Sequence, residues 1–298
     1  MGIDVGGTKV ALRIEGDGAR AVGSVFRWPP VSPSAPHRSA TERDLASLAR
    51  HVGLLRAEWG GPVRSVGVAM PATVDGEGRV LTWPGRPHWT GLGLHEELRG
   101  LIPGAAVRFA DDGDLAALAE AGRAGCRNLV YLGVGTGIGG GVVVDGRTVP
   151  GPGRGSCEVG HIVVDRAGPR CDCGRHGCVQ ALASGPATLR RAATLLGGPV
   201  DFDALRNGFA AGAGWAVSAV QESGEALATA AVSLCELTHP ERVLIGGGFA
   251  SGLPGLVTVV TEHTRRLARP GVPPVPVGEA ALGGLSSLYG AVSLARGR

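Results

Sequence analysis

The chain has 298 residues, of which 44% are hydrophobic, and a formal net charge of +3. A chain of this length and apolar content can fill two modest domains with packed cores. The small net charge and the scattered arginines exclude a dense basic surface for nucleic acid, and no apolar run approaches the roughly 18 residues of a membrane span. The N-terminus lacks a signal-peptide pattern, so we expect a cytoplasmic protein with no nucleic-acid or membrane partner.

The first part of the chain alternates between strand and helix patterns, with a loop rich in proline and serine at Pro29–Pro36. Residues 1–9 read as a short strand that runs into a glycine turn. Further strands are predicted at Ala11–Ile14, Ala21–Phe26, Val63–Ala69 and Ala106–Ala110, and helices at Thr41–Glu58 and Leu92–Leu101.

The second part repeats this alternation around another glycine-rich hairpin. Strands are predicted at Leu129–Gly133, Gly140–Val144 and Arg242–Ile245, and helices at Asp114–Ala124, Ala187–Leu196, Phe202–Ala211, Ala216–Leu237 and Ser286–Ala295. Two α/β units with a glycine-rich hairpin in each indicate a duplication and an α/β fold.

The segment from Asp4 to Lys9 is a turn between two predicted strands. Gly6 and Gly7 would let backbone N–H groups approach an anionic phosphate closely. Thr8 could add a hydroxyl donor, and Lys9, the only lysine in the chain, could add a positive charge. Asp4 could hold Mg²⁺ through water. The alternative is a tight hairpin that merely needs glycine, and the single lysine favours the phosphate site.

A second glycine-rich turn lies between the first two strands of the second unit. Gly133–Gly141 has six glycines in nine residues. Each glycine loses backbone entropy on folding, so this density indicates a ligand that needs close approach to the backbone. Gly246–Gly248 directly follows the predicted strand Arg242–Ile245 and has either the same role or a purely structural one.

Three aspartates lie where the chain leaves the strand Ala106–Ala110 and enters a helix: Asp111, Asp112 and Asp114. An enzyme that transfers phosphate to an alcohol needs a carboxylate to accept the hydroxyl proton. Helix capping is the alternative role for Asp112 and Asp114. Because Asp111 stands beside Asp112, like-charge repulsion should raise the pKa of one of the two carboxyl groups.

One histidine and three cysteines lie within eighteen residues: His161, Cys171, Cys173 and Cys178. One imidazole and three thiolates form a closed tetrahedral set for Zn²⁺ that leaves no open position for chemistry. We therefore expect a structural zinc ion in a reducing compartment, and a cluster of buried free cysteines is the alternative. The zinc would fix the polar side chains of Glu158 and Gln180, which flank the set.

Four segments, taken in order, resemble the ROK family, which contains bacterial sugar kinases and sugar-responsive repressors. They are Gly2–Lys9, Leu132–Gly141, Glu158–Cys178 and Val243–Gly248. The resemblance covers nearly the full length and implies two ribonuclease H-like domains of the actin and hexokinase type with an interdomain cleft. We expect a small domain in residues 1–110, a large domain with the zinc loop in 111–283, and a closing helix in 284–298 that packs on the first domain.

The resemblance also implies an ATP-dependent kinase with Mg²⁺ and ATP on the two glycine hairpins. The implied nucleotide contacts are Asp4, Gly6, Gly7, Thr8, Lys9, Gly135, Thr136, Gly137, Gly247 and Gly248. Asp112 aligns with the general base of the family. The implied substrate contacts are Asp111, Glu158, His161, Gln180 and Gly85.

Departures from the family's pattern all lie on the sugar side. Asp111 stands for an asparagine, Gln180 for a glutamate, and Pro84–Gly85 for a Pro-Asn pair. The amide of Gln180 removes a charge-assisted acceptor near the sugar's O1, a hydrogen bond of roughly 1.5–3 kcal/mol. We therefore expect the acceptor to be a monosaccharide or a sugar-like C7 cyclitol, phosphorylated on its primary hydroxyl, and plain glucokinase activity is the near alternative.

A sugar-sensing repressor is the rival from another class of protein. Family repressors carry a helix-turn-helix segment ahead of the phosphate motif, and this sequence starts at that motif. A second rival is a scaffold protein that keeps the kinase fold without catalysis. Such a protein would have lost the general base, whereas Asp112 is present here. We expect an enzyme that binds ATP and a small sugar or cyclitol and assembles as a homodimer or homotetramer.

Overall fold

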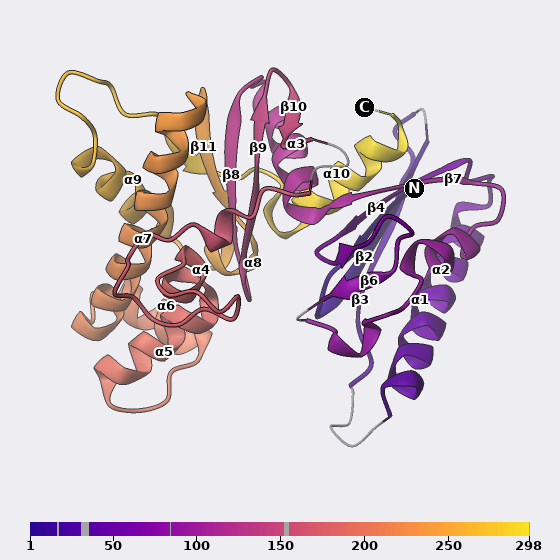
Figure 1. Cartoon of the computed structure of the whole chain (residues 1–298), viewed down its shortest axis with the longest axis horizontal. Coiled ribbons are helices and arrows are strands. Elements are labelled where there is room, and N and C mark those ends of the chain that lie inside the picture. The colour runs from indigo at the N-terminus through magenta and orange to yellow at the C-terminus, as the bar shows by residue number, and fades with distance from the viewer. Residues whose placement is uncertain (17, 31–35, 84, 152–154, 298) are drawn as a thin grey trace. The chain divides into compact units, whose positions relative to one another are not determined.

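The computed structural model describes residues 1–16, 18–30, 36–83, 85–151 and 155–297. Contacts divide the chain into two compact units, which are Met1–Leu115 with Ser287–Arg298, and Ala116–Ser286. Figure 1 shows the strands and helices of each unit along the colour ramp. Among the described residues, no helix combines the length and the apolar character that crossing a lipid bilayer requires.

The first unit is built on a five-stranded sheet with the order β3-β2-β1-β4-β7. Strands β1, β2 and β3 form an antiparallel meander, and β1, β4 and β7 are parallel. The strands are β1 (Gly2–Val5), β2 (Lys9–Glu15), β3 (Ala21–Arg27), β4 (Ser65–Met70) and β7 (Ala106–Asp111). The unit is completed by helices α1 (His37–Trp59), α2 (Leu94–Gly100) and α10 (Ser286–Ala295), the 3₁₀ turn η1 (Pro87–Trp89), and a hairpin of β5 (Thr73–Val74) and β6 (Val80–Thr82).

The two faces of this sheet are packed differently. Alternate residues such as Ile3 and Leu12 are fully buried in a cluster that includes Leu48 of α1. The opposite face carries glycines where helix α10 (Ser286–Ala295) crosses it. A Cβ atom on Gly67 would overlap the carbonyl oxygen of Ala291. Glycine therefore lets the last helix lie directly on the strands of the first unit.

The sheet of the second unit repeats the arrangement of the first, with the order β10-β9-β8-β11-β12. Its meander is antiparallel and its β8, β11 and β12 strands are parallel. The strands are β8 (Leu129–Val134), β9 (Ile138–Val144), β10 (Arg147–Val149), β11 (Arg242–Gly246) and β12 (Val277–Glu279). The same strand order and direction in both sheets support the duplication that the two hairpins indicate.

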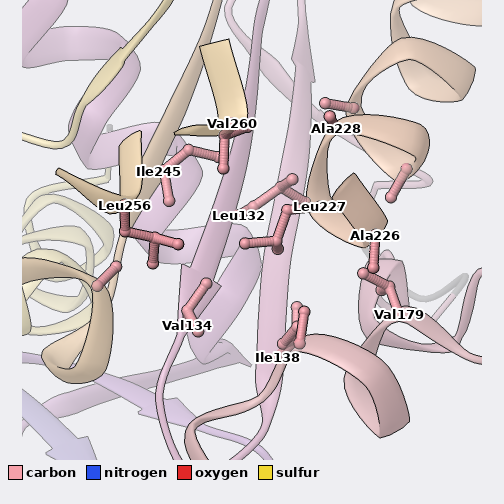
Figure 2. Packing of buried hydrophobic residues seen from close by; sticks show 14 of the residues in the cluster. Leu132, Val134, Ile138, Val179, Ala226, Leu227, Ala228, Ile245, Leu256 and Val260 are labelled. Carbon is pink, nitrogen blue, oxygen red and sulfur yellow. The ribbon is translucent and has the colours of Figure 1, made fainter. Parts of the chain in front are cut away.

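Helices cover both faces of the second sheet. Helix α3 (Asp112–Ala124) packs on Tyr131 and Leu244, whereas their neighbours Leu132 and Ile245 face the core drawn in Figure 2. That core includes Leu227 of α7 and Val260 of α9. The remaining helical segments are α4 (Val179–Ala183), α5 (Gly185–Leu196), α6 (Phe202–Ala210), α7 (Gly214–Thr238), α8 (Gly248–Gly252), α9 (Leu256–Arg266), η2 (Val159–His161) and η3 (Gly283–Leu285).

The border between the units lies a few residues beyond the expected ones at 110 and 283. Asp111 still pairs with Met70 in the first sheet, and Leu115 packs with Ala69 and Ala291 of the first unit. Asp111 and Asp112 thus belong to the first unit. On the other side, Glu120 is fully buried and accepts hydrogen bonds from residues 281, 282 and 286, so helix α3 holds the end of the second unit in place.

Candidate functional site

Three carboxylates gather at one edge of the first sheet. Asp4 lies near the carboxyl end of β1, Asp111 ends β7, and Asp112 begins α3. Because β1, β4 and β7 are parallel, their carboxyl ends meet at the same edge, where open α/β sheets bind ligands. All three side chains are half-buried.

The pKa values of Asp112 and Asp4 are raised. Burial, together with the charges of Asp111 and Asp4, raises the pKa of Asp112 to about 8. Burial also raises the pKa of Asp4 to about 6, against the opposing charge of Lys9. A carboxyl group with a pKa near neutrality is suited to accept a proton, as a general base must.

Helix α3 is capped by Asp111. Its Oδ1 accepts the N–H groups of Gly113 at 2.9 Å and Asp114 at 3.2 Å, in the manner of an N-cap residue. The capping role that the sequence offered to Asp112 or Asp114 therefore belongs to their neighbour, and capping does not explain Asp112.

The first glycine turn connects β1 to β2 and is closed by a hydrogen bond from Gly6 N–H to the Lys9 carbonyl, 3.1 Å long. Thr8 and Lys9 are exposed. Gly85 lies against the turn, since a Cβ on Gly85 would stand 3.1 Å from Cα of Gly7. Two backbones this close make a side chain at either position a tight fit. The neighbouring Pro84 is outside the described residues.

A buried polar cluster that the sequence analysis did not identify lies next to this turn. Asp44 of α1 is 1% exposed, and its Oδ2 accepts from Arg86 at 3.0 Å and from Trp89 Nε1 at 3.0 Å. His88 Nε2 lies 2.7 Å from the same oxygen. Asp44 lies on the buried face of α1, four residues before Leu48, so a charged residue in line with apolar ones was the sequence signal that could have identified it.

The second glycine turn lies between β8 and β9 and is held by its own unit. Gly135 N–H donates to the Gly137 carbonyl and the Gly135 carbonyl accepts from Gly185 N–H, both at 2.9 Å. Gly247 has a φ of 85°, and a Cβ there would stand 2.5 Å from the Val134 carbonyl oxygen. Thr136 and Gly248 are exposed. The structure thus brings both predicted glycine segments of the second unit together.

Ile138, the residue after this turn, is the meeting point of the predicted substrate residues of the second unit. Its N–H donates to Oε1 of Gln180 at 3.1 Å, and a Cβ on Gly160 would overlap its carbonyl oxygen. Gly160 separates Glu158 from His161, so both sit beside the turn. Glu158 is exposed and accepts from Ser156 Oγ. The amide of Gln180 therefore has a structural partner of its own.

The expected metal ligands converge. The ligand atoms of His161, Cys171, Cys173 and Cys178 all lie within 4.8 Å of one another. Two of the separations, Cys171 Sγ to His161 Nδ1 and Cys173 Sγ to Cys178 Sγ, are 3.6 Å. Tetrahedral zinc with its usual bond lengths separates its ligands by about 3.5–3.8 Å, so this set fits Zn²⁺.

The backbone around these ligands is tightly folded. Gly177 has a φ of 69°, and a Cβ there would overlap the Asp165 carbonyl. The N–H of Arg175 lowers the pKa of Cys173 to about 7, whereas burial raises the pKa of Cys178 to about 12. Four donors of suitable chemistry, His161 among them, thus lie on one tightly folded loop.

Comparison with known proteins identifies the family. The model of the ROK family matches residues 1–298. The chain belongs to the ROK family. It is 54% identical to a kanosamine kinase from Amycolatopsis mediterranei over 295 residues, which cover 99% of this chain and 95% of that protein.

Solved structures of the family agree. A ROK hexokinase from Thermus thermophilus matches with a TM-score of 0.82 and 32% identity, over 99% of this chain and 97% of its own. A ROK glucokinase from Streptomyces griseus, solved with glucose and AMPPNP, matches with a TM-score of 0.81 and 26% identity, over 100% and 99%. The predicted family, the two-domain actin- and hexokinase-like fold and the enzyme class, an ATP-dependent sugar kinase, are confirmed.

Proposed function

We propose that this ROK kinase transfers the γ-phosphoryl group of ATP to the primary hydroxyl of an amino sugar, with kanosamine, 3-amino-3-deoxyglucose, as its preferred acceptor. The observation that carries the proposal is the 54% identity to a kanosamine kinase along almost the whole of both chains. Relatives named for other sugars, such as the N-acetylmannosamine kinase of Salmonella typhi and the glucokinase of Thermotoga maritima, are 34% and 30% identical.

Asp112 is the general base in this proposal. Its carboxylate would take the proton of the acceptor hydroxyl as the oxygen attacks the γ-phosphorus, and its raised pKa makes it a stronger base than an ordinary aspartate. Mg²⁺, held through Asp4, would neutralise charge on the transferring phosphoryl group. The N–H groups of the two glycine turns would bind the phosphates.

Asp111 supports an acceptor that carries an amine. An asparagine at this position would donate an N–H to a sugar hydroxyl, whereas a carboxylate accepts only. The charges of Asp111 and Asp4 already raise the pKa of Asp112. A protonated amine on the acceptor supplies both the donors and the positive charge that this group of carboxylates favours.

Gln180 was the residue that suggested a cyclitol acceptor, through its neutral amide. Because its Oε1 accepts the Ile138 N–H, as a glutamate oxygen would equally, this contact does not show whether an amide or a carboxylate suits the acceptor. The acceptor preference therefore rests on the relative and on Asp111, and a C7 cyclitol becomes one of the outcomes of the test below.

We also propose that His161, Cys171, Cys173 and Cys178 hold a structural Zn²⁺, which the convergence of their ligand atoms supports. The ion would fix the segment that carries Glu158, a proposed sugar contact. His161 would then contact the sugar, if at all, through Nε2, because Nδ1 faces Cys171. The cytoplasmic location and the homodimer or homotetramer stay predictions.

The test is an ADP-release assay with kanosamine, glucose, glucosamine, N-acetylmannosamine and a C7 cyclitol. We expect kcat/KM for kanosamine to exceed that for glucose by about tenfold or more. Asp112→Asn should lower kcat by about 10²–10⁴ and leave ATP affinity nearly unchanged. Asp111→Asn should lower kcat/KM for kanosamine about tenfold and change that for glucose less.

Three outcomes would contradict the proposal. Equal or better turnover of glucose would make the enzyme a plain glucokinase. Preference for the cyclitol would restore the alternative acceptor. Loss of activity in Asp111→Asn, together with a mild effect of Asp112→Asn, would show that the base is assigned to the wrong aspartate.

A further inference from the structure

Three consecutive carbonyl groups of the first glycine turn are held from one side. Trp28 Nε1 donates to the Gly6 carbonyl at 2.7 Å, and the backbone N–H of Trp28 donates to the Thr8 carbonyl at 3.3 Å. Arg86 donates to the Gly7 carbonyl between them at 3.4 Å. Trp28 and Arg86, which are distant in sequence, thus hold the carbonyl groups of the turn by hydrogen bonds. Without them, the peptide groups of this glycine-rich turn would be free to rotate.

Holding the carbonyls fixes the N–H groups of the same peptide units. In a trans peptide the C=O and N–H bonds point in opposite directions, and the peptides of this turn are trans. Fixing the Gly6 carbonyl therefore aims the Gly7 N–H, and fixing the Gly7 carbonyl aims the Thr8 N–H. Within the ranges that the structure describes, neither of these two N–H groups donates to a protein acceptor.

Arg86 is itself held rigidly. Its guanidinium donates to Asp44 Oδ2 and lies 4.3 Å from the centre of the Trp28 ring. Arg86 is 3% exposed and Asp44 is 1% exposed. A buried ion pair with these contacts contributes little net stability compared with apolar residues, so geometric definition is the better account of its presence. The Trp28 indole and the Arg86 guanidinium therefore form a rigid pair that supports the carbonyl side of the turn.

We propose that Trp28 and the Asp44–Arg86 pair are positioning residues that preorganise the Gly7 and Thr8 N–H groups for the nucleotide phosphates. The inference rests on the proposed function in one respect, that ATP is the phosphoryl donor. N–H groups fixed before binding lose no entropy when the anion arrives, which strengthens binding without any new contact. Neither Trp28 nor Asp44 needs to touch the nucleotide for this effect.

The test uses Trp28→Phe and Arg86→Lys in the full-length protein. Phenylalanine keeps a ring beneath the guanidinium but lacks the N–H, and lysine keeps the charge for Asp44 but lacks the fork of donors. Each variant should raise the Kd of AMPPNP in calorimetry, and KM for ATP, about five- to twentyfold. KM for the sugar should change less than twofold.

Matched controls come from a similar pair elsewhere in the first unit. Arg20 lies 4.6 Å from the centre of the Trp59 ring and donates to the Trp59 carbonyl, away from the turn. Arg20→Lys and Trp59→Phe should leave both nucleotide constants unchanged. Melting temperatures of all four variants show whether each protein is folded. A purely structural defect would weaken sugar and nucleotide binding together, whereas a loss of positioning would weaken nucleotide binding alone.

Unchanged AMPPNP affinity in both Trp28→Phe and Arg86→Lys would overturn the inference, as would an equal loss of sugar and nucleotide affinity. Failure of the wild type to bind AMPPNP would overturn the inference and the proposed function together. Tight AMPPNP binding by the wild type without turnover of any sugar tested would count against the acceptor alone. In that case the effect of the two variants on AMPPNP affinity still decides the inference.

Discussion

The residue with the most unusual chemistry in this chain is Asp112. It lies among carboxylates at the edge of the first sheet, and burial with the charges of Asp111 and Asp4 raises its pKa to about 8. In the ligand-free protein this carboxyl group is largely protonated at neutral pH. A cation bound beside the three carboxylates would lower the pKa again and deliver the base in its active form.

This environment predicts the pH dependence of catalysis. The dependence of kcat/KM on pH reports groups of the free enzyme, so kcat/KM for the acceptor should rise up to about pH 8 and level off above it. Asp111→Asn removes one like charge and should move the rise about one pH unit lower. Steady-state rates from pH 5.5 to 9.5, with ATP and acceptor both far below their KM values so that the free enzyme predominates, measure both curves.

Asparagine at position 111 keeps an Oδ1 that can cap helix α3, so the substitution tests charge rather than folding. A flat profile across this range, or the same midpoint in both proteins, would contradict the assignment of Asp112 as a base with a raised pKa.

At the scale of elements, the segment Val159–Cys178 has little regular structure, and the proposed metal would hold it in shape. Cys173→Ser should remove the zinc, lower the free energy of unfolding by about 4 kcal/mol, as expected for an ion at a thousand times its Kd, and raise KM for the acceptor more than for ATP. Elemental analysis and chemical unfolding measure the first two effects.

Cys126 offers the control for this change. It lies outside the metal set, where its Sγ contacts the Ala124 carbonyl, and Cys126→Ser should keep both zinc and stability. A wild-type protein purified without zinc, or a fully stable Cys173→Ser protein, would rule out the structural metal.

Helix α10 depends on a glycine in the strand beneath it. Gly67→Ala would place a methyl group into the Ala291 carbonyl and should destabilise the protein by about 3 kcal/mol, because helix and strand must separate. Gly53 on α1 is the matched control, since nothing lies within 4 Å of its Cβ position. Gly53→Ala should stabilise by up to about 1 kcal/mol. Denaturant midpoints of both variants measure these changes in stability. A Gly67→Ala protein as stable as the wild type would show that α10 packs more loosely on the strand.

The sequence predicted the elements whose patterns are strong and local. The helix expected at Ala216–Leu237 is α7 (Gly214–Thr238), and the strand expected at Arg242–Ile245 is β11. Helix α9 (Leu256–Arg266) was not predicted, because the threonines and β-branched residues of its sequence fit strands equally well and its helical form depends on packing against α7. Strands β10 and β12 are three residues long and exist only as edges of the sheet.

The candidate site divides in the same way. Contiguous motifs, such as the glycine turns and the cysteine set, were visible in the sequence because each is one local segment. Asp44 and Arg86 were not identified, since 42 residues separate them and no single motif contains both. The partner of Gln180 was hidden for the same reason, because the Ile138 N–H is a backbone group with no sequence signature.

At the scale of the whole molecule, the carboxylates set the dependence of stability on pH. A carboxyl group whose pKa is raised on folding stabilises the protein fully below its unfolded pKa, near 4, and this contribution is lost as pH rises through about 8. The ligand-free protein should therefore become less stable between these values. Asp112→Asn should remove this loss and raise the free energy of unfolding by about 2–4 kcal/mol at pH 8.5.

Urea unfolding of the wild type and Asp112→Asn at pH 5 and pH 8.5 measures this gain, with Asp203→Asn at an exposed position as the control. A variant that gains no stability at the higher pH would show that Asp112 ionises in the folded protein as it does in the unfolded chain.

Lys9 allows the whole folded molecule to be labelled chemically at a single amine. It is the sole lysine, it is exposed, and the other primary amine, at Met1, is buried and donates to the Ser65 carbonyl. An activated ester therefore acylates the folded chain at the glycine turn, and bound nucleotide should slow this acylation if the turn holds its phosphates. The Met1 amine becomes reactive when β1 leaves the sheet, so a second acyl group on the chain, read by mass spectrometry, counts unfolding events.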